Sequence, residues 1–400
     1  MNEYIIFIGT HRSGSSRDGI EAGKKLGYST ILFTNNRRII REKDLFPEVD
    51  EMVEVDLKQE EALRKEITSL QQAGKKIACI ISFFDAHVSL SARLSNEFCG
   101  TDITLQPIAD CMDKTELRMK LTGKEYSPDF IKMEPPFSTD KARTIPYPFI
   151  LKSPVSNGSK DVLLIHDEEE LAWGIKKLNR KKPSTILVEE YLDGPQYLIE
   201  AVVKEGKPVI AVVVKQEINY QKRFIVTGYS VSPENHQPEL VKKVEEIIND
   251  LGFINGSCHL EMRLVKDQWK LIEINPRISG GAMNKMIEEA YGLSIVEETL
   301  RVYLSKPNTI KPKWKKHIYT CYMTVNKVGK LLKVSGQNKA EEHEGIIEVY
   351  IKSKKGKILR PPTSMGHRYG YVMAYGESVQ ESEERAKNAA KEIRFYLEST

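Results

Sequence analysis

Cysteine is scarce in this chain of 400 residues, and its pattern argues against two kinds of site. The five cysteines are scattered and include no C-x-x-C pair: Cys79, Cys99, Cys111, Cys258 and Cys321. A disulfide scaffold uses an even and closely spaced set, and a structural zinc site uses paired thiols. The cysteines therefore predict free thiols in a reducing compartment.

A strong excess of one charge and long apolar runs are also missing. The chain has 60 lysine and arginine residues against 56 acidic ones, a net charge of +4, which predicts no nucleic-acid surface. No run approaches the roughly 20 apolar residues of a membrane helix, and the first residues do not resemble a secretory signal. We expect a cytoplasmic protein that binds neither nucleic acid nor membranes. The lysine-rich segment 311–316 is interpreted as a solvated linker.

The most informative stretch covers residues 257–281, where two short runs alternate between apolar and polar residues. In the first run one face carries His259, Glu261 and Arg263. In the second run we expect one face to carry Leu271, Glu273 and Asn275. Ile272 and Ile274 then fall on the other face. A period of two predicts half-buried strands, here joined by a polar turn over residues 266–268.

A hairpin centred on Asp267 places Glu261 opposite Glu273 and His259 opposite Asn275. Opposed side chains have Cβ atoms roughly 5 Å apart, so the two carboxylates repel unless a cation lies between them. Two carboxylates and an amide are all-oxygen ligands, which suit Mg²⁺ or Mn²⁺ better than zinc. The alternative is an exposed hairpin whose carboxylates are simply solvated.

The sequence around this hairpin resembles a known family. Glu261, followed by the run E-I-N-P-R over residues 273–277, is similar to the metal-binding hairpin of ATP-grasp ligases. The version it looks most like occurs in carbamoyl-phosphate synthetase, biotin carboxylase and the L-amino-acid ligases. The resemblance implies that Glu261, Glu273 and Asn275 hold one or two Mg²⁺ or Mn²⁺ ions that bridge the phosphates of ATP.

Substrate contacts are expected directly after the metal residues. By the resemblance, Arg277 is catalytic and acts on an acyl phosphate or on the substrate carboxylate. Ser279, Gly280 and Gly281 allow close approach of backbone and are expected to bind substrate.

The resemblance implies an α/β chain, α+β within its lobes, with the ATP-grasp fold in three domains. Residues 1–108 read as a doubly wound, Rossmann-like domain, because short apolar strands alternate with helical patterns. Residues 109–305 form the ATP-grasp domain and residues 306–400 a small C-terminal domain that closes on a helix. His11, Arg12 and Asp85 follow predicted strands, where such sheets bind ligands, although surface loops explain them equally well.

Two lysines are candidates for ATP phosphates. Lys114 and Arg118 share a helix face that could be merely solvated, but the family carries D-K-x-x-x-R here, so one of them is expected at a phosphate. Lys152 ends an apolar strand, where a charge is costly unless an anion meets it. The small-residue loop after it resembles the phosphate-covering loop of the family and contains Ser156, Asn157, Gly158 and Ser159.

The adenine site is expected at a hinge near residues 189–193. The family's hinge motif, E-E-Y-L, is present as Glu189, Glu190, Tyr191 and Leu192. Gln196 falls where many relatives place a glutamate on the ribose hydroxyls, so it departs from the family pattern.

Two later segments stay open. Residues 216–233 line the substrate pocket in amino-acid ligases, or form an ordinary loop of the lobe. His367 and Arg368 reach the active site or, as we favour, lie at the surface.

These observations predict an ATP-dependent carboxylate–amine ligase that acts through an acyl phosphate. Amino acids are the expected substrates, Lys152 and Arg277 the expected catalytic residues, and a homodimer is compatible with the resemblance. The alternatives are a biotin-carboxylase-like or purine-pathway enzyme that uses bicarbonate, and an ATP-binding protein without catalysis.

Overall fold

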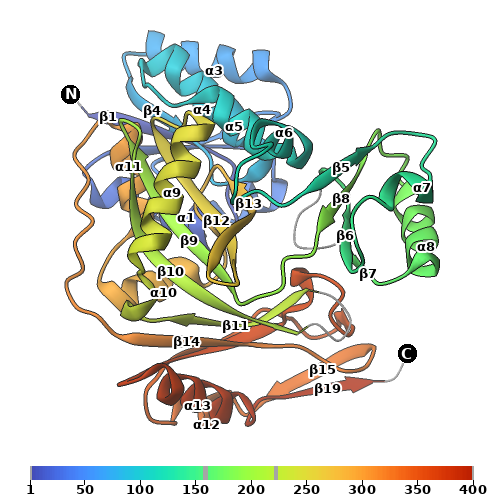
Figure 1. Cartoon of the computed structure of the whole chain (residues 1–400). Helices are drawn as coiled ribbons and strands as arrows, with labels where there is room; N and C mark the ends of the chain where they lie inside the picture. Colours follow the sequence, from blue (N-terminus) through green and yellow to red (C-terminus); the bar gives the residue numbers. More distant parts are fainter. Residues whose placement is uncertain (1, 156–160, 220–223, 399–400) are drawn as a thin grey trace.

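The computed structural model describes residues 2–155, 161–219 and 224–398 (Figure 1). Within these ranges the strands form four sheets, two of which flank the nucleotide-binding candidates. Among the described residues, no helix is long and apolar enough to cross a bilayer.

The N-terminal part is a parallel sheet with the strand order β3-β2-β1-β4. Its strands read as near-continuous apolar runs because helices cover both faces. This confirms the doubly wound layout. The elements are β1 (Glu3–Ile8), α1 (Ser15–Lys25), β2 (Ser29–Thr34), α2 (Arg37–Arg41), β3 (Glu51–Glu54), α3 (Glu60–Gln72), β4 (Lys76–Ile81) and α4 (Asp85–Cys99).

Two helices lead from this sheet to a small antiparallel lobe. The helices are α5 (Leu105–Met112) and α6 (Lys114–Lys120), and Asp113 caps α6 by accepting hydrogen bonds from two backbone amides. The lobe has the strand order β5-β8-β6-β7 and stands apart at the right of Figure 1. Its elements are β5 (Phe130–Met133), α7 (Thr139–Ala142), β6 (Phe149–Lys152), β7 (Val162–Ile165), α8 (Glu168–Asn179) and β8 (Ile186–Glu190).

An eight-stranded sheet forms the centre of the molecule, in the order β13-β12-β9-β10-β11-β14-β18-β16. Its strands are β9 (Gln196–Lys204), β10 (Lys207–Asn219), β11 (Ile225–Val231), β12 (Gly256–Val265), β13 (Gln268–Asn275), β14 (His317–Met323), β16 (Ile346–Ile351) and β18 (Gly370–Gly376). The helices that pack against it are α9 (Pro238–Leu251), α10 (Met283–Tyr291), α11 (Ile295–Tyr303) and α13 (Val379–Ala390).

Strands from the C-terminal segment continue this sheet. Antiparallel pairing joins β14 to β11, and β18 and β16 follow. The remaining elements, a short helix and a three-stranded sheet, are β15 (Gly329–Ser335), α12 (Gln337–Glu341), β17 (Ile358–Leu359) and β19 (Arg394–Glu398). The expectation that the chain closes on a helix is wrong, because α13 ends at Ala390 and the strand β19 follows. The three domain boundaries stay predictions.

The hairpin β12–β13 confirms the predicted pairs and corrects the turn. Glu261 lies opposite Glu273 and His259 opposite Asn275. The turn has only two residues, Lys266 and Asp267, both with positive φ (46° and 62°), as a tight hairpin turn requires.

A shift of one residue in the pairing compensates for the shorter turn. Leu271 pairs with Met262 and is fully buried, while Ile272 turns to the pocket, so their predicted faces are exchanged. A β-bulge explains the exchange, because one extra residue on one strand moves the alternation by one step.

The hinge packs closely on this hairpin, and Gly194 makes the approach possible. A Cβ on Gly194 would lie 2.1 Å from the carbonyl oxygen of Leu264. We expect Gly194→Ala to lower the free energy of unfolding by about 1–3 kcal/mol, because the backbone must move apart. Thermal unfolding of Gly366→Ala is the control, since a Cβ there meets only Ser364 Oγ at 3.5 Å. Equal unfolding midpoints for the two variants would contradict the close approach.

Candidate active site

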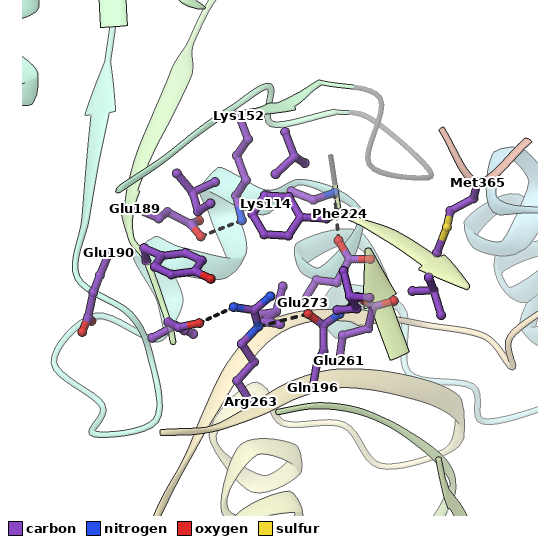
Figure 2. A pocket seen from close by; sticks show the side chains of 17 residues that line it. Lys114, Lys152, Glu189, Glu190, Gln196, Phe224, Glu261, Arg263, Glu273 and Met365 are labelled. Atoms are coloured by element: carbon purple, nitrogen blue, oxygen red, sulfur yellow. Dashed lines mark hydrogen bonds and ion pairs between the residues drawn. The ribbon is translucent and has the colours of Figure 1, made fainter. Parts of the chain in front are cut away.

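One pocket lies between the lobe, the hinge and the hairpin β12–β13 (Figure 2). It brings together residues from four distant parts of the sequence. The predicted site residues that line it are Lys114, Lys152, Glu189, Glu190, Tyr191, Leu192, Gln196, Glu261 and Glu273. Their individual ligand roles stay predictions, but their shared pocket joins both lysines, the hinge and the carboxylates.

A buried carboxylate holds the hinge end of this pocket together. Arg118 donates to Glu189 from Nε (2.9 Å) and Nη2 (3.2 Å), and Lys152 Nζ lies 2.6 Å from the same carboxylate. Arg118 also donates to the carbonyl of Ile272 in the hairpin. Its guanidinium is therefore used inside the protein, and Lys114 is the residue of the pair that lines the pocket.

The charge of Lys152 is finely balanced. Burial lowers the pKa of Lys152 to about 8, although the neighbouring Glu189 carboxylate favours the charged form. Burial alone would raise the pKa of Glu189, but the charges of Arg118 and Lys152 hold it below its ordinary value. An anion placed next to Lys152 would stabilise the protonated amine further, which suits a phosphate site.

The two hairpin carboxylates are held in opposite electrostatic states. Burial, and then the charge of Glu273, raise the pKa of Glu261. Burial would also raise the pKa of Glu273, but Lys114, at 3.3 Å, and the Asn275 amide lower it. Bringing a cation between the carboxylates would remove the proton that Glu261 otherwise retains.

The donor set fits a hard divalent cation. The Asn275 amide nitrogen donates to Glu273 Oε1 (3.1 Å), so its oxygen is the atom that would bind a metal. No cluster of three or more His, Cys, Asp or Glu side chains suited to a metal occurs in the described part of the chain. Two carboxylates and an amide would leave the remaining positions to water and phosphate oxygens, as Mg²⁺ prefers.

Gln196 is occupied by neighbouring side chains. Its amide nitrogen donates to Gln216 (2.7 Å) and Glu261 (3.1 Å), and its oxygen accepts from Arg263 (3.1 Å). This network fixes the end of β9 against the metal hairpin. The role of Gln196 at a ribose stays a prediction.

The predicted substrate loop lies beyond the hairpin, beside the pocket. Arg277 forms an ion pair with Asp85, which begins α4 of the N-terminal sheet. The amide of Ser279 donates to buried Glu200 (3.0 Å), and its carbonyl accepts from Ser15 (2.7 Å). Gly280 and Gly281 are exposed. The N-terminal domain thus holds the loop that carries Arg277.

Two buried groups behind this loop position it. His259 Nδ1 lies 2.9 Å from the carbonyl of Arg277, and burial lowers the pKa of His259 to about 4. A neutral imidazole can only donate to that carbonyl, which assigns the proton to Nδ1. Burial raises the pKa of Glu200 to about 7, although hydrogen bonds from Ser279 oppose the shift.

The residues whose role the sequence left undecided, His11, Arg12, His367 and Arg368, have different surroundings. Arg12 pairs with Glu42, and the His11 ring lies 4.3 Å from that of Phe84. His367 accepts from the amide of Thr363 (3.1 Å). The surface position that we favoured is wrong for Arg368, whose Nη1 is buried.

Several pocket residues escaped the sequence reasoning. Arg263 lies on the face of Glu261, so the alternation could have found it; its guanidinium is 5.4 Å from the ring of Tyr191. No pattern in the sequence around Met365 predicted a site, because only the tertiary fold brings this residue to the pocket. The others are Ile150, Val162, Ile218, Phe224, Val226 and Ile272.

The open segment 216–233 does contribute to the pocket, through Ile218, Phe224 and Val226. The predicted phosphate-covering residues, Ser156 to Ser159, lie outside the described residues.

Comparisons with known families agree with this geometry. Three family models match consecutive parts of the chain: an ATP-grasp N-terminal domain over residues 20–98, an ATP-grasp domain over 145–285, and an L-amino acid ligase C-terminal domain 2 over 321–398. The chain belongs to the ATP-grasp family. The second match contains Lys152, the hinge and the whole metal hairpin.

Two curated relatives of this ATP-grasp protein are a ligase and a synthase of low identity. It is 30% identical over 190 residues to the D-alanine–D-alanine ligase of Petrotoga mobilis and 21% identical over 266 residues to dapdiamide A synthase of Enterobacter agglomerans. The alignments cover 45% and 62% of this chain. They cover 62% and 61% of the relatives, so the chain spans about three fifths of their length.

A solved structure matches over nearly the full length of both chains. The L-amino acid ligase of Bacillus licheniformis superposes with a TM-score of 0.81 at 19% identity, over 100% of this chain and 99% of that one. The ATP-grasp fold predicted from the hairpin is thereby confirmed.

The pKa of Lys152 leads to a pH-dependent affinity. Below about pH 8 the amine is charged, and above it the charge is lost. We expect the affinity for metal-free ADP, measured by calorimetry in EDTA, to fall by up to about tenfold per pH unit above that value. EDTA is needed because deprotonation of Glu261 favours metal binding, which would otherwise raise the affinity for ADP as the pH rises. Lys152→Met should bind ADP weakly and with a flatter pH profile; parallel profiles would contradict the assignment.

Proposed function

We propose that this ATP-grasp protein joins a carboxylate to an amine, with amino acids as substrates and ATP as the source of energy. The observation that carries the proposal is the pair Glu261 and Glu273, directly opposed on the hairpin and facing the pocket that Lys114 and Lys152 line. A site with two carboxylates and two lysines is suited to a metal-bound polyphosphate.

The reaction has two steps. An oxygen of the substrate carboxylate attacks the γ-phosphorus of ATP, so that an acyl phosphate forms and ADP leaves. The amine nitrogen then attacks the acyl carbon, inorganic phosphate leaves, and the nitrogen loses a proton to give the amide. No nucleophilic side chain is needed, because the chemistry depends on position and on neutralisation of charge.

Each group of the chain has a distinct task in this scheme. Glu261, Glu273 and the Asn275 oxygen would hold Mg²⁺, which supplies positive charge at the phosphates. Lys152 and Lys114 neutralise phosphate oxygens from the lobe and from α6. Arg277, fixed by Asp85 and by the His259 bond to its carbonyl, places a cation next to the loop 279–281.

The matched relatives support the choice of substrates. The Petrotoga and Bacillus proteins are named as amino acid ligases, and the family model over residues 321–398 is that of an L-amino acid ligase domain. The chain spans only part of the curated relatives, so its substrates are tested directly.

The test measures ADP and phosphate release with Mg·ATP and each of the twenty amino acids, singly and in pairs, with bicarbonate alone as a separate condition. We expect stimulation by one amino acid or one pair, together with an amide product detected by mass spectrometry. Stimulation by bicarbonate alone would overturn the proposal in favour of a carboxylase. ATP binding without turnover under every condition would indicate a binding protein.

Replacing one hairpin carboxylate tests the metal site. Glu273→Gln keeps the shape but removes one negative charge, so we expect turnover to fall by about a hundredfold or more. The rise in melting temperature caused by Mg·ATP should also shrink. Glu245→Gln, at an exposed position of α9, is the matched control and should behave as wild type. An unchanged turnover rate in Glu273→Gln would refute the assignment.

A further inference from the structure

The face of the central sheet that carries the metal hairpin continues into the C-terminal segment. Directly paired residues of neighbouring strands lie on the same face, and the pairs run from Gln196 to Gln216 and from Gln216 to Tyr229. Tyr229 pairs with Thr320, two residues before Tyr322. The face of Glu261 therefore extends over β11 and β14.

Tyrosines cover this extension. Tyr322 pairs with Tyr371, which pairs with Tyr350. The ring centroids are 5.4 Å apart between Tyr229 and Tyr322, 5.8 Å between Tyr322 and Tyr371, and 5.3 Å between Tyr371 and Tyr350. The first two pairs meet edge to face and the third is tilted, so the rings form an aromatic cluster on the same side as the metal hairpin.

A guanidinium lies over one of these rings. The Arg368 carbon Cζ is 3.8 Å from the ring centroid of Tyr322 and 5.7 Å from that of Tyr229. Its Nη1 atom is buried and has no hydrogen-bond partner among the described residues, and the same holds for Thr320 Oγ1. The guanidinium has a side-chain hydrogen bond with Tyr229, but the buried N–H groups on Nη1 are costly without an acceptor, so this arrangement favours an incoming one.

Arg368 lies between the pocket and the predicted substrate loop, residues 279–281. Met365, three residues earlier, lines the pocket on the side of Glu261 away from Glu189 and Glu190 (Figure 2). The Tyr322 hydroxyl lies 4.0 Å from where a Cβ on Gly281 would be. Arg368 therefore stands beyond the metal carboxylates, next to the loop that follows Arg277.

A basic side chain also lies near Arg368. Burial, followed by the charges of Lys357 and Arg368, lowers the pKa of Lys352. Lys352 therefore adds positive charge near Arg368, which favours an anion there.

We propose that Arg368 binds a free carboxylate of the amine substrate, so that this substrate is an amino acid and not ammonia or a simple amine. The proposal rests on the proposed function and deepens it. In the proposed function Lys114 and Lys152 bind the phosphates of ATP, whereas Arg368 lies on the opposite side of Glu261. A planar guanidinium stacked on an aromatic ring offers paired donors that match a carboxylate.

The test compares wild type with Arg368→Gln, Arg368→Lys and, as a matched control, Arg360→Gln, which alters an exposed arginine nearby. Each amino acid that wild type uses as the amine is measured beside its carboxamide, for example L-alanine beside L-alaninamide. We expect Arg368→Gln to raise KM for the amino acid roughly tenfold to a hundredfold and to change KM for the carboxamide far less. Arg368→Lys should recover part of the loss.

Three results would overturn the proposal. They are equal losses for amino acid and carboxamide, a fall in kcat without a change in KM, and loss of Mg·ADP binding, which would show a structural or phosphate role.

If wild type releases no ADP with any amino acid, the ligase function fails, and thermal shifts then decide the proposal separately. Amino acids that stabilise the Mg·ADP complex of wild type but not of Arg368→Gln would support Arg368 as a carboxylate site. No difference between the two proteins would refute it.

Discussion

The repulsion between Glu261 and Glu273 is the constraint on which the site depends. Two carboxylates directly opposed on one face of a hairpin cannot both be charged at low cost without a cation. Lys114 relieves part of this repulsion, and the remainder adds to the effect of burial, which is the main cause of the raised pKa of Glu261. Under the proposed function, a metal ion held between the carboxylates would remove this repulsion and so add to the affinity for Mg·ATP.

The surroundings of the carboxylates keep them in place. Arg118 connects α6, the hinge strand and the hairpin by bonding to Glu189 and to the carbonyl of Ile272. Behind the loop that carries Arg277, Asp85 and Ser15 provide contacts from the N-terminal domain. The lobe, the hairpin and the N-terminal sheet are thus linked through polar groups, of which Arg118, Glu189 and Ser15 are buried and Asp85 is partly exposed.

The sequence was sufficient for the parts that depend on local pattern. Alternation predicted that Glu261 and Glu273 lie opposite each other. The cost of a charge in an apolar strand singled out Lys152 as a candidate site residue, and it does line the pocket. The sequence could not decide between Leu271 and Ile272, because two adjacent apolar residues fit either face and the bulge that chooses depends on packing. Arg368 was misjudged for another reason: only the order of strands in the sheet, which no local pattern encodes, brings β14 and β18 beside β11.

The continuity of that sheet also limits how the chain can be divided. In a chain that ended after α11, β11 would lose its pairing with β14 and would present a row of unpaired amides and carbonyls. Such an uncovered edge invites pairing between molecules. The C-terminal strands thus cover an edge of the central sheet that would otherwise be open to pairing between molecules, as well as extending the sheet.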